Sequence, residues 1–106
     1  MFEIEIHEDT LQELYGLPPL LRAKMTRQID KLAAYGTSLR EPDTKSVKDG
    51  FFELRAKAGD VGRAIYVYRK GKRIFVLKIF VKSTAKLPSS VLTAAARRLE
   101  EMLNDE

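Results

Sequence analysis

Basic side chains gather in the middle of the sequence in a pattern suited to binding an anion. Between Arg55 and Lys86 the chain holds ten Lys or Arg and one acid, Asp60. A planar guanidinium offers two N–H donors to two phosphate oxygens, so Arg55 and Arg63 are candidates to hold a phosphate group. Lys86 and Lys82 would add positive charge. The pattern predicts a surface for a polyanion, or else a solvated basic face without a ligand.

Fixed cations of this kind can stabilise negative charge on the oxygens of a bound phosphate group. The competing interpretation is that Arg55 pairs with Glu53, which lies on the same side of its strand, or with an acid across the sheet.

Two tyrosines and two further lysines are candidates for contacts with RNA. Tyr66 and Tyr68 share one side of their strand. Facing the basic surface, they would stack an unpaired base; facing the helices, they would belong to the core. We favour core or rim for both, because buried aromatic side chains are more common than stacking platforms. Lys57 and Lys78 are the two lysines.

Three strand-like runs position these residues. They cover Phe51–Lys57, Arg63–Lys70 and Arg73–Lys82, and they are rich in aromatic and β-branched residues. A Gly-rich turn at 58–62 joins the first two, and a tight turn at 70–72 joins the last two. The third run is nearly continuous in apolar residues, which predicts a central strand covered on both faces.

The flanking segments predict one more strand and three helices. Residues 2–6 alternate between apolar and polar side chains, which predicts a strand. Asp9 or Thr10 is expected to cap a short helix that ends at Gly16. A longer helix opens at Pro18–Pro19 and ends at Gly36, with an apolar stripe expected in the core. Residues 37–50 read as a surface connection with a short extended piece near 45–48. The last helix runs from Ser89 or Ser90 to Leu103, and its buried stripe is Leu92, Ala95, Leu99, Met102 and Leu103. This order predicts an α+β domain with the helices on one face of a curved sheet.

Composition narrows the class of protein. The 106 residues suit one domain, 1–106, and no run is apolar enough for a membrane span. Cysteine is absent, and the single His and scattered acids do not form a ligand pattern, so we expect no metal and no cofactor. Residues 1–13 hold five acids and no Lys or Arg, and the last seven residues hold four acids. We expect a cytoplasmic protein.

Three motifs in order give the chain a family resemblance. They are Gly50–Arg55 (GFFELR), Gly62–Tyr66 (GRAIY) and Phe80–Thr84 (FVKST), followed by Pro88 at a helix start. Together they resemble the RelE/ParE toxin superfamily, and more closely its HigB-like, phage-derived branch.

The resemblance implies a RelE-like fold and the toxin of a type II toxin–antitoxin system. Such a toxin cleaves mRNA in the ribosomal A site, so its partners would be the ribosome, mRNA and a helix-turn-helix (HigA-like) antitoxin, with no membrane. Matching the motifs points to Arg55, Arg63 and Lys82 as catalytic positions, with Lys86 next. In the metal-free RNA cleavage that the resemblance implies, the ribose 2′-OH attacks the adjacent phosphorus. We hypothesise that Arg55 and Arg63 would hold the scissile phosphate, and that Lys82 or Lys86 would transfer a proton.

Two other functions remain open. One is a toxin resembling ParE, which poisons DNA gyrase by binding and cuts nothing. The other is a catalytically inactive module that binds an antitoxin. The basic strip favours RNA cleavage over gyrase poisoning, but the sequence contains no strong isolated nucleophile or base that would identify an active enzyme.

Overall fold

Five strands form one sheet, in the order β1-β5-β4-β3-β2, and three α-helices pack on it. The computed structural model describes residues 1–81 and 86–106. The strands are β1 (Glu3–Ile6), β2 (Thr44–Ser46), β3 (Phe52–Ala58), β4 (Asp60–Arg69) and β5 (Arg73–Val81). The helices are α1 (Glu8–Tyr15), α2 (Pro19–Tyr35), the 3₁₀ turn η1 (Gly36–Ser38) and α3 (Ser89–Asn104). The predicted α+β class is confirmed.

The predicted meander forms the centre of the sheet. β3, β4 and β5 pair antiparallel in sequence order, and β1 pairs parallel with β5. The first hairpin is tighter than predicted, because β4 already begins at Asp60 and only Gly59, at φ 78°, lies between the strands. β2 is a short edge strand in the segment that the sequence suggested was mostly a surface connection. It forms because β3 leaves an unpaired edge beside it.

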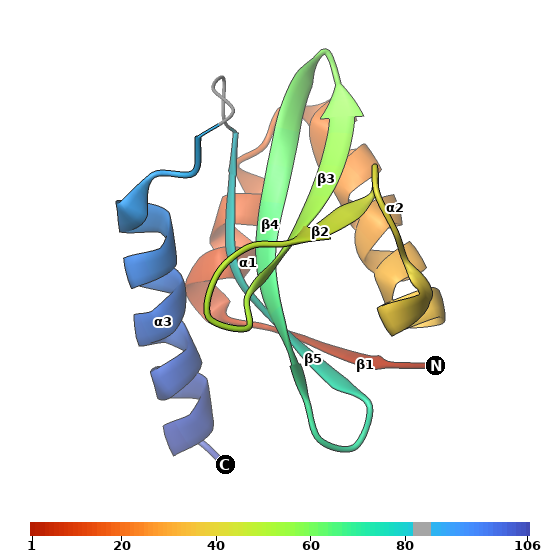
Figure 1. Ribbon diagram of the computed structural model, residues 1–106. Helices are drawn as coiled ribbons and strands as arrows, with labels where there is room; N and C mark the ends of the chain where they lie inside the picture. The colour runs from red at the N-terminus through yellow and green to blue at the C-terminus, as the bar shows by residue number, and fades with distance from the viewer. Residues whose placement is uncertain (82–85) are drawn as a thin grey trace.

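The helices cover both faces of the sheet, which corrects the predicted one-face arrangement. α2 and α3 lie on opposite sides of the strands in Figure 1, with α1 behind them. Alternate residues of β5 divide accordingly: Ile74 and Val76 join the core with α1 and α2, whereas Phe75 and Leu77 join the core with α3. A strand that is apolar on both faces needs cover on both, so the last helix must take the second face.

Helix α2 packs through its predicted stripe, since Leu21, Met25, Ile29 and Leu32 are all buried. The helix ends at Gly36, as expected. Gly36 has a φ of 49°, and the ring of Phe2 lies against it so closely that an added Cβ would fall 2.0 Å from a ring carbon. This contact fixes the chain start against the end of α2.

The start of α1 differs from the prediction, whereas that of α3 agrees with it. The cap of α1 is His7 rather than Asp9 or Thr10: the Nδ1 of His7 accepts a 3.0 Å hydrogen bond from the backbone N–H of Asp9. The imidazole takes this place because its Nε2 lies 2.7 Å from Oε1 of Glu101 on α3, which holds the ring. α3 begins at Ser89, as predicted, and no side chain of the described residues caps it.

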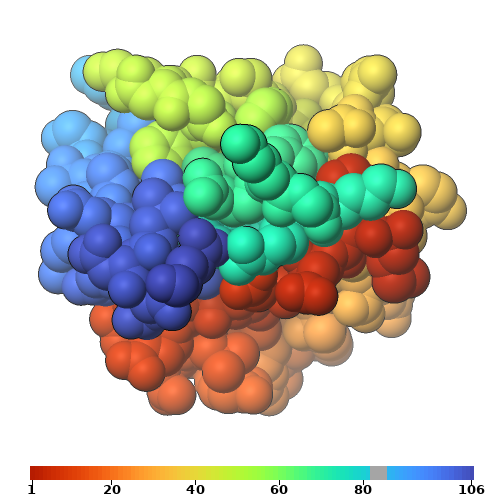
Figure 2. All heavy atoms as spheres, turned by 90° about the horizontal axis from the view of Figure 1, so that it is seen from below, coloured from red at the N-terminus to blue at the C-terminus, as the bar shows by residue number. Residues whose placement is uncertain are grey.

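The two ends of the chain meet beside the β4–β5 hairpin. Seen from below, the C-terminal end of α3 lies against this hairpin, and the N-terminal segment lies next to both (Figure 2). Glu106 accounts for part of this contact, since its carboxylate pairs with Arg73 at 2.8 Å and approaches Arg69 at 3.9 Å. Within the described ranges, no helix is long and apolar enough to cross a membrane.

Candidate functional site

A cleft of about 450 Å³ opens beside the β3–β4 hairpin. Three of the side chains that line it are cations, Arg55 and Lys57 from β3 and Arg63 from β4. The remaining lining residues are Gln28, Pro42, Asp43 and Val61. The structure therefore places two predicted catalytic arginines and one predicted RNA-binding lysine in one hollow.

Strand register brings the two arginines together. Arg55 and Arg63 are directly opposed in the antiparallel β3–β4 pair, so their side chains leave the same face of the sheet. Arg55 donates from Nε at 3.0 Å, and Arg63 from a terminal nitrogen at 2.7 Å, to the same Oε1 of Glu53. The pairing of Arg55 with Glu53, considered as the competing interpretation, is thus present, and it extends to Arg63.

The charges in this trio do not balance. Two guanidinium groups share one carboxylate, so one positive charge is left over. The Nε of Arg63 is buried and has no hydrogen-bond partner among the residues that the structure describes. The Arg55 side chain is 26% exposed and that of Arg63 14%. An incoming anion would find both the excess charge and unused donors in the cleft.

The backbone at Arg55 is held from the side of α2. The buried side-chain amide of Gln28 donates at 2.7 Å to the carbonyl of Arg55 and at 3.0 Å to Asp43. The backbone N–H of Arg55 donates to the carbonyl of Asp43 at 2.8 Å. Hydrogen bonds from Lys31 and Gln28 lower the pKa of Asp43, so its carboxylate stays charged and paired.

Sequence reasoning did not identify Gln28 or Asp43. The signal for Gln28 was present, because a glutamine between Met25 and Ile29 on the apolar stripe of a helix needs buried partners. No sequence pattern marked Asp43, because one acid among many polar residues in an irregular segment does not stand out.

The other predicted lysines have different surroundings. Lys57 is exposed at the cleft. Lys78 donates to Glu13 at 2.5 Å, so its ammonium is already paired. Lys86 is exposed just before α3. Lys82 lies outside the described residues.

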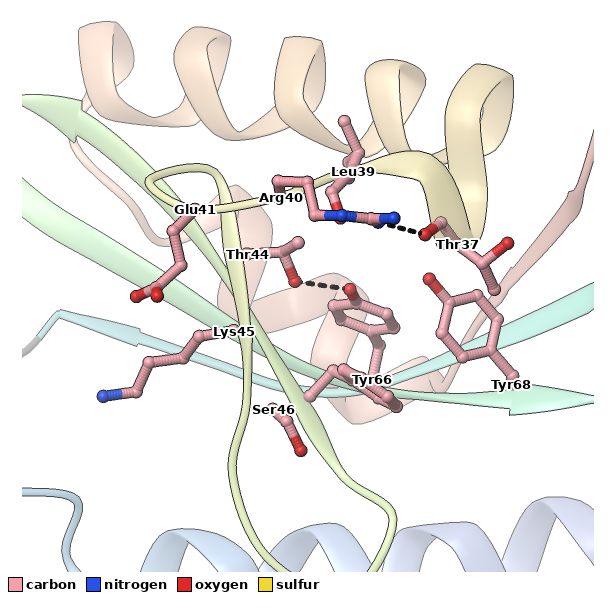
Figure 3. A pocket seen from close by; sticks show the side chains of 10 residues that line it. Thr37, Leu39, Arg40, Glu41, Thr44, Lys45, Ser46, Tyr66 and Tyr68 are labelled. Atoms are coloured by element: carbon pink, nitrogen blue, oxygen red, sulfur yellow. Dashed lines mark hydrogen bonds between the residues drawn. The ribbon is translucent and has the colours of Figure 1, made fainter.

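The tyrosines face the other side of the sheet. Tyr66 is fully buried, shares a 2.5 Å hydrogen bond with Thr44 and stacks on Phe52. Burial raises the pKa of Tyr66, and also that of Tyr68. Both hydroxyls face a cavity of about 730 Å³ near η1 and β2 (Figure 3). The structure places this pair in the core or at its rim, as favoured from the sequence. Both rings therefore lie on the opposite face of the sheet from Arg63.

Acids from near the chain ends pair with cations in another part of the basic strip. Arg73 is held by both carboxylate oxygens of Glu5, at 2.7 and 3.2 Å, and by Glu106. Glu13 accepts from Lys78 and, at 2.8 and 3.1 Å, from the buried Arg98. The hairpin end that carries the cleft receives none of these terminal acids, so the cleft keeps its positive charge.

Comparison with solved structures finds the same fold in bacterial and archaeal proteins. A mutant of the E. coli toxin RelE in the free state has a TM-score of 0.67 at 17% identity, over 92% of this chain and 97% of that one. A chain of the archaeal RelE–RelB complex from Pyrococcus horikoshii has a TM-score of 0.61 at 27% identity, over 79% and 98%. A chain of the toxin–antitoxin complex RelBE2 from Mycobacterium tuberculosis has a TM-score of 0.50 at 21% identity, over 76% and 98%.

Comparison with curated protein sequences gives no significant match. The model of the phage-derived Gp49-like family matches residues 12–100, which is most of the chain and includes the cleft. The RelE-like fold and this family match agree with the motif resemblance read from the sequence. The chain therefore belongs to the Gp49-like family of phage-derived proteins, within the RelE/ParE toxin superfamily.

Proposed function

We propose that this chain is the toxin of a type II toxin–antitoxin system and that it cleaves mRNA on the ribosome. The observation that carries the proposal is the cleft in which Arg55 and Arg63 converge on one carboxylate oxygen and leave one positive charge uncompensated. Family membership adds support, as do similar structures whose names are those of toxins and toxin–antitoxin complexes.

The cleft suits phosphate chemistry. The 2′-oxygen forms a bond to phosphorus while the bond from phosphorus to the 5′-oxygen breaks, giving a 2′,3′-cyclic phosphate and a 5′-hydroxyl. Arg55 and Arg63 would donate to the two non-bridging oxygens, where negative charge grows. Donors fixed before the reaction cost no reorganisation when that charge develops, which is the main benefit of such a site.

The proton transfers need two further groups. One base must accept the proton of the 2′-OH, and one acid must supply a proton to the leaving 5′-oxygen. We assign these transfers to Lys82 and Lys86, which follow β5 in the chain. The ribosome would position the mRNA, so the cleft itself needs to supply only part of the alignment.

The proposed partner is an antitoxin of the helix-turn-helix, HigA-like type. Two of the similar solved structures are complexes named for both a toxin and its antitoxin. The HigB-like assignment and the cytoplasmic location that ribosome binding requires belong to the same proposal.

Primer extension on a reporter mRNA tests the function. Wild type and Arg63→Ala are each induced in cells, and the assay is repeated in a ribosome-containing extract and with naked RNA. Arg69→Ala is the matched control. Arg69 lies at the opposite end of β4 from Arg63, and its replacement removes the same charge. We expect cuts in the translated frame that need ribosomes, persist in Arg69→Ala and disappear in Arg63→Ala. Growth arrest without cuts would instead indicate gyrase poisoning, to be checked by a supercoiling assay.

A further inference from the structure

Glu53 is a nearly inaccessible carboxylate in the middle of a basic surface. Its side chain is 3% exposed, and it lies on β3 opposite Ile65 of β4. Arg55 and Arg63 both donate to its Oε1. Both donors are positively charged, so they compensate the charge of the carboxylate.

Fold stability does not explain a carboxylate at this position. A buried ion pair contributes about as much as a well-packed apolar side chain of the same size, because desolvation of the charges offsets their attraction. The neighbouring Leu54 and the opposing Ile65 show that this part of the sheet accommodates aliphatic residues. The carboxylate must therefore be understood through what it does to the arginines.

Glu53 fixes the direction of both guanidinium groups. Among the described residues, Arg55 is held by Glu53 at Nε and Arg63 at one terminal nitrogen, so the other terminal N–H groups are left to donate to a ligand. A free arginine side chain loses rotamer entropy when a ligand immobilises it. A shared anchor removes that loss before the ligand arrives.

We propose that Glu53 is a positioning residue that holds Arg55 and Arg63 as a preorganised pair for one phosphate group. The proposal rests on the proposed function in one respect, since the phosphate would be that of mRNA. Both arginines donate to Oε1 of this carboxylate, so one atom sets the direction of both guanidinium groups.

The direction in which Glu53→Gln changes phosphate affinity distinguishes a positioning role from a purely electrostatic effect. Glu53→Gln keeps the size of the side chain and removes a negative charge, so long-range electrostatics alone would make an anion bind more tightly. Loss of the anchor would make it bind more weakly, because the arginines would no longer share one orientation. Glu100→Gln is the matched control: it removes the same charge from an exposed residue of α3.

The experiment is a titration of the full chain with inorganic phosphate, followed through the side-chain Nε–H signals of Arg55 and Arg63 by NMR. In wild type we expect both signals to shift with one dissociation constant. In Glu53→Gln we expect the dissociation constant for phosphate to rise roughly tenfold. This is the size of effect expected when one charge-assisted hydrogen bond no longer holds the arginines in place. Glu100→Gln should match wild type or bind slightly more tightly.

Two results would overturn the proposal. One is phosphate binding by Glu53→Gln as tight as by Glu100→Gln, and the other is a wild type whose arginine signals do not respond to phosphate. If Glu53→Gln does not fold, Glu53→Asp serves instead, since it keeps the charge and withdraws the carboxylate by one methylene; unchanged phosphate binding by that variant is equally decisive.

The mRNA assay separates this proposal from the proposed function. If the anchored pair binds phosphate as expected and wild type makes no cuts, the endonuclease function fails while the role of Glu53 stands. If wild type cuts, we expect Glu53→Gln to cut roughly 100-fold more slowly, which is the usual effect of a misplaced catalytic contact. Cutting at the wild-type rate by a variant with weakened phosphate binding would show that the arginine pair does not act on the scissile phosphate.

Discussion

Arg55 and Arg63 lie opposite each other on β3 and β4 and are joined through a single oxygen atom of a buried glutamate. The arginine closer to that oxygen, Arg63 at 2.7 Å, is also the more buried one. Removing either arginine therefore changes both the charge of the cleft and the compensation of a buried carboxylate. Mutations here need a stability measurement beside every activity measurement.

Arg63→Ala should lower the free energy of unfolding by about 2–3 kcal/mol, because it leaves Glu53 with one partner in a buried position. Urea denaturation measures this. The double variant Arg63→Ala/Glu53→Gln should recover part of the loss, since the orphaned charge is gone. An undiminished loss in the double variant would show that Arg63 acts through packing rather than through the carboxylate.

Lys57→Ala should weaken binding of single-stranded RNA without changing stability, because Lys57 is exposed at the cleft. If Lys57 neutralises one phosphate, the slope of log K against log salt should decrease by about 0.7. Fluorescence anisotropy at several salt concentrations measures the slope. Lys70→Ala, an exposed lysine at the far end of β4, is the control and should bind with a slope closer to wild type.

Tyr66→Phe should preserve mRNA cleavage and reduce stability by about 1 kcal/mol, because it removes a buried hydrogen bond to Thr44 on the face opposite the arginines. Thermal unfolding and the primer-extension assay measure the two effects. Loss of cleavage at unchanged stability would mean that this ring contacts the substrate after all.

Glu13 should make stability depend on pH below neutrality. Burial raises the pKa of Glu13, but hydrogen bonds from Arg98, Lys78 and the backbone of β5 together lower it below its ordinary value of 4.5. A carboxyl whose folded-state pKa is depressed contributes stability above its unfolded pKa, and this contribution is lost as the pH falls through the folded-state pKa.

Glu13→Gln should therefore cost about 2 kcal/mol at pH 7 and progressively less below about pH 4.5, where wild type also loses the charge. Urea midpoints measured from pH 7 downwards give the comparison. A gap between variant and wild type that stays constant with pH would contradict the ion-pair explanation.

Gly36→Ala should be among the most damaging small substitutions. Its φ of 49° disfavours a side chain, and the added Cβ would collide with the ring of Phe2 at 2.0 Å. We expect a loss above about 2 kcal/mol, since strain and overpacking add. Gly59→Ala is the control, because its φ is also positive but nothing lies within 4 Å, so it should cost only about 1 kcal/mol. Equal losses in urea denaturation would mean that Phe2 moves aside.

Local sequence patterns were sufficient for the order of elements and for much of the site. The meander followed from its aromatic and β-branched runs, the α2 stripe from its helical spacing, and the common side of Glu53 and Arg55 from a two-residue separation. These relations depend on neighbours within a strand or a turn of helix, where geometry is fixed by the backbone. The same local rules placed Tyr66 and Tyr68 on one side, but not on a particular face of the sheet.

Tertiary structure decided which cations remain available. The sequence shows ten basic residues between Arg55 and Lys86, and apart from the motif resemblance nothing in it says which of them are paired. Folding brings Glu5 to Arg73, 68 residues away, and Glu13 to Lys78, 65 residues away, and so neutralises part of the strip. It also sends α3 to the second face and makes His7 a helix cap held by Glu101. Such pairings depend on where the two ends of the chain pack on the sheet, and no local sequence pattern encodes that position. The register that places Arg55 opposite Arg63 differs, because it follows from a single tight hairpin.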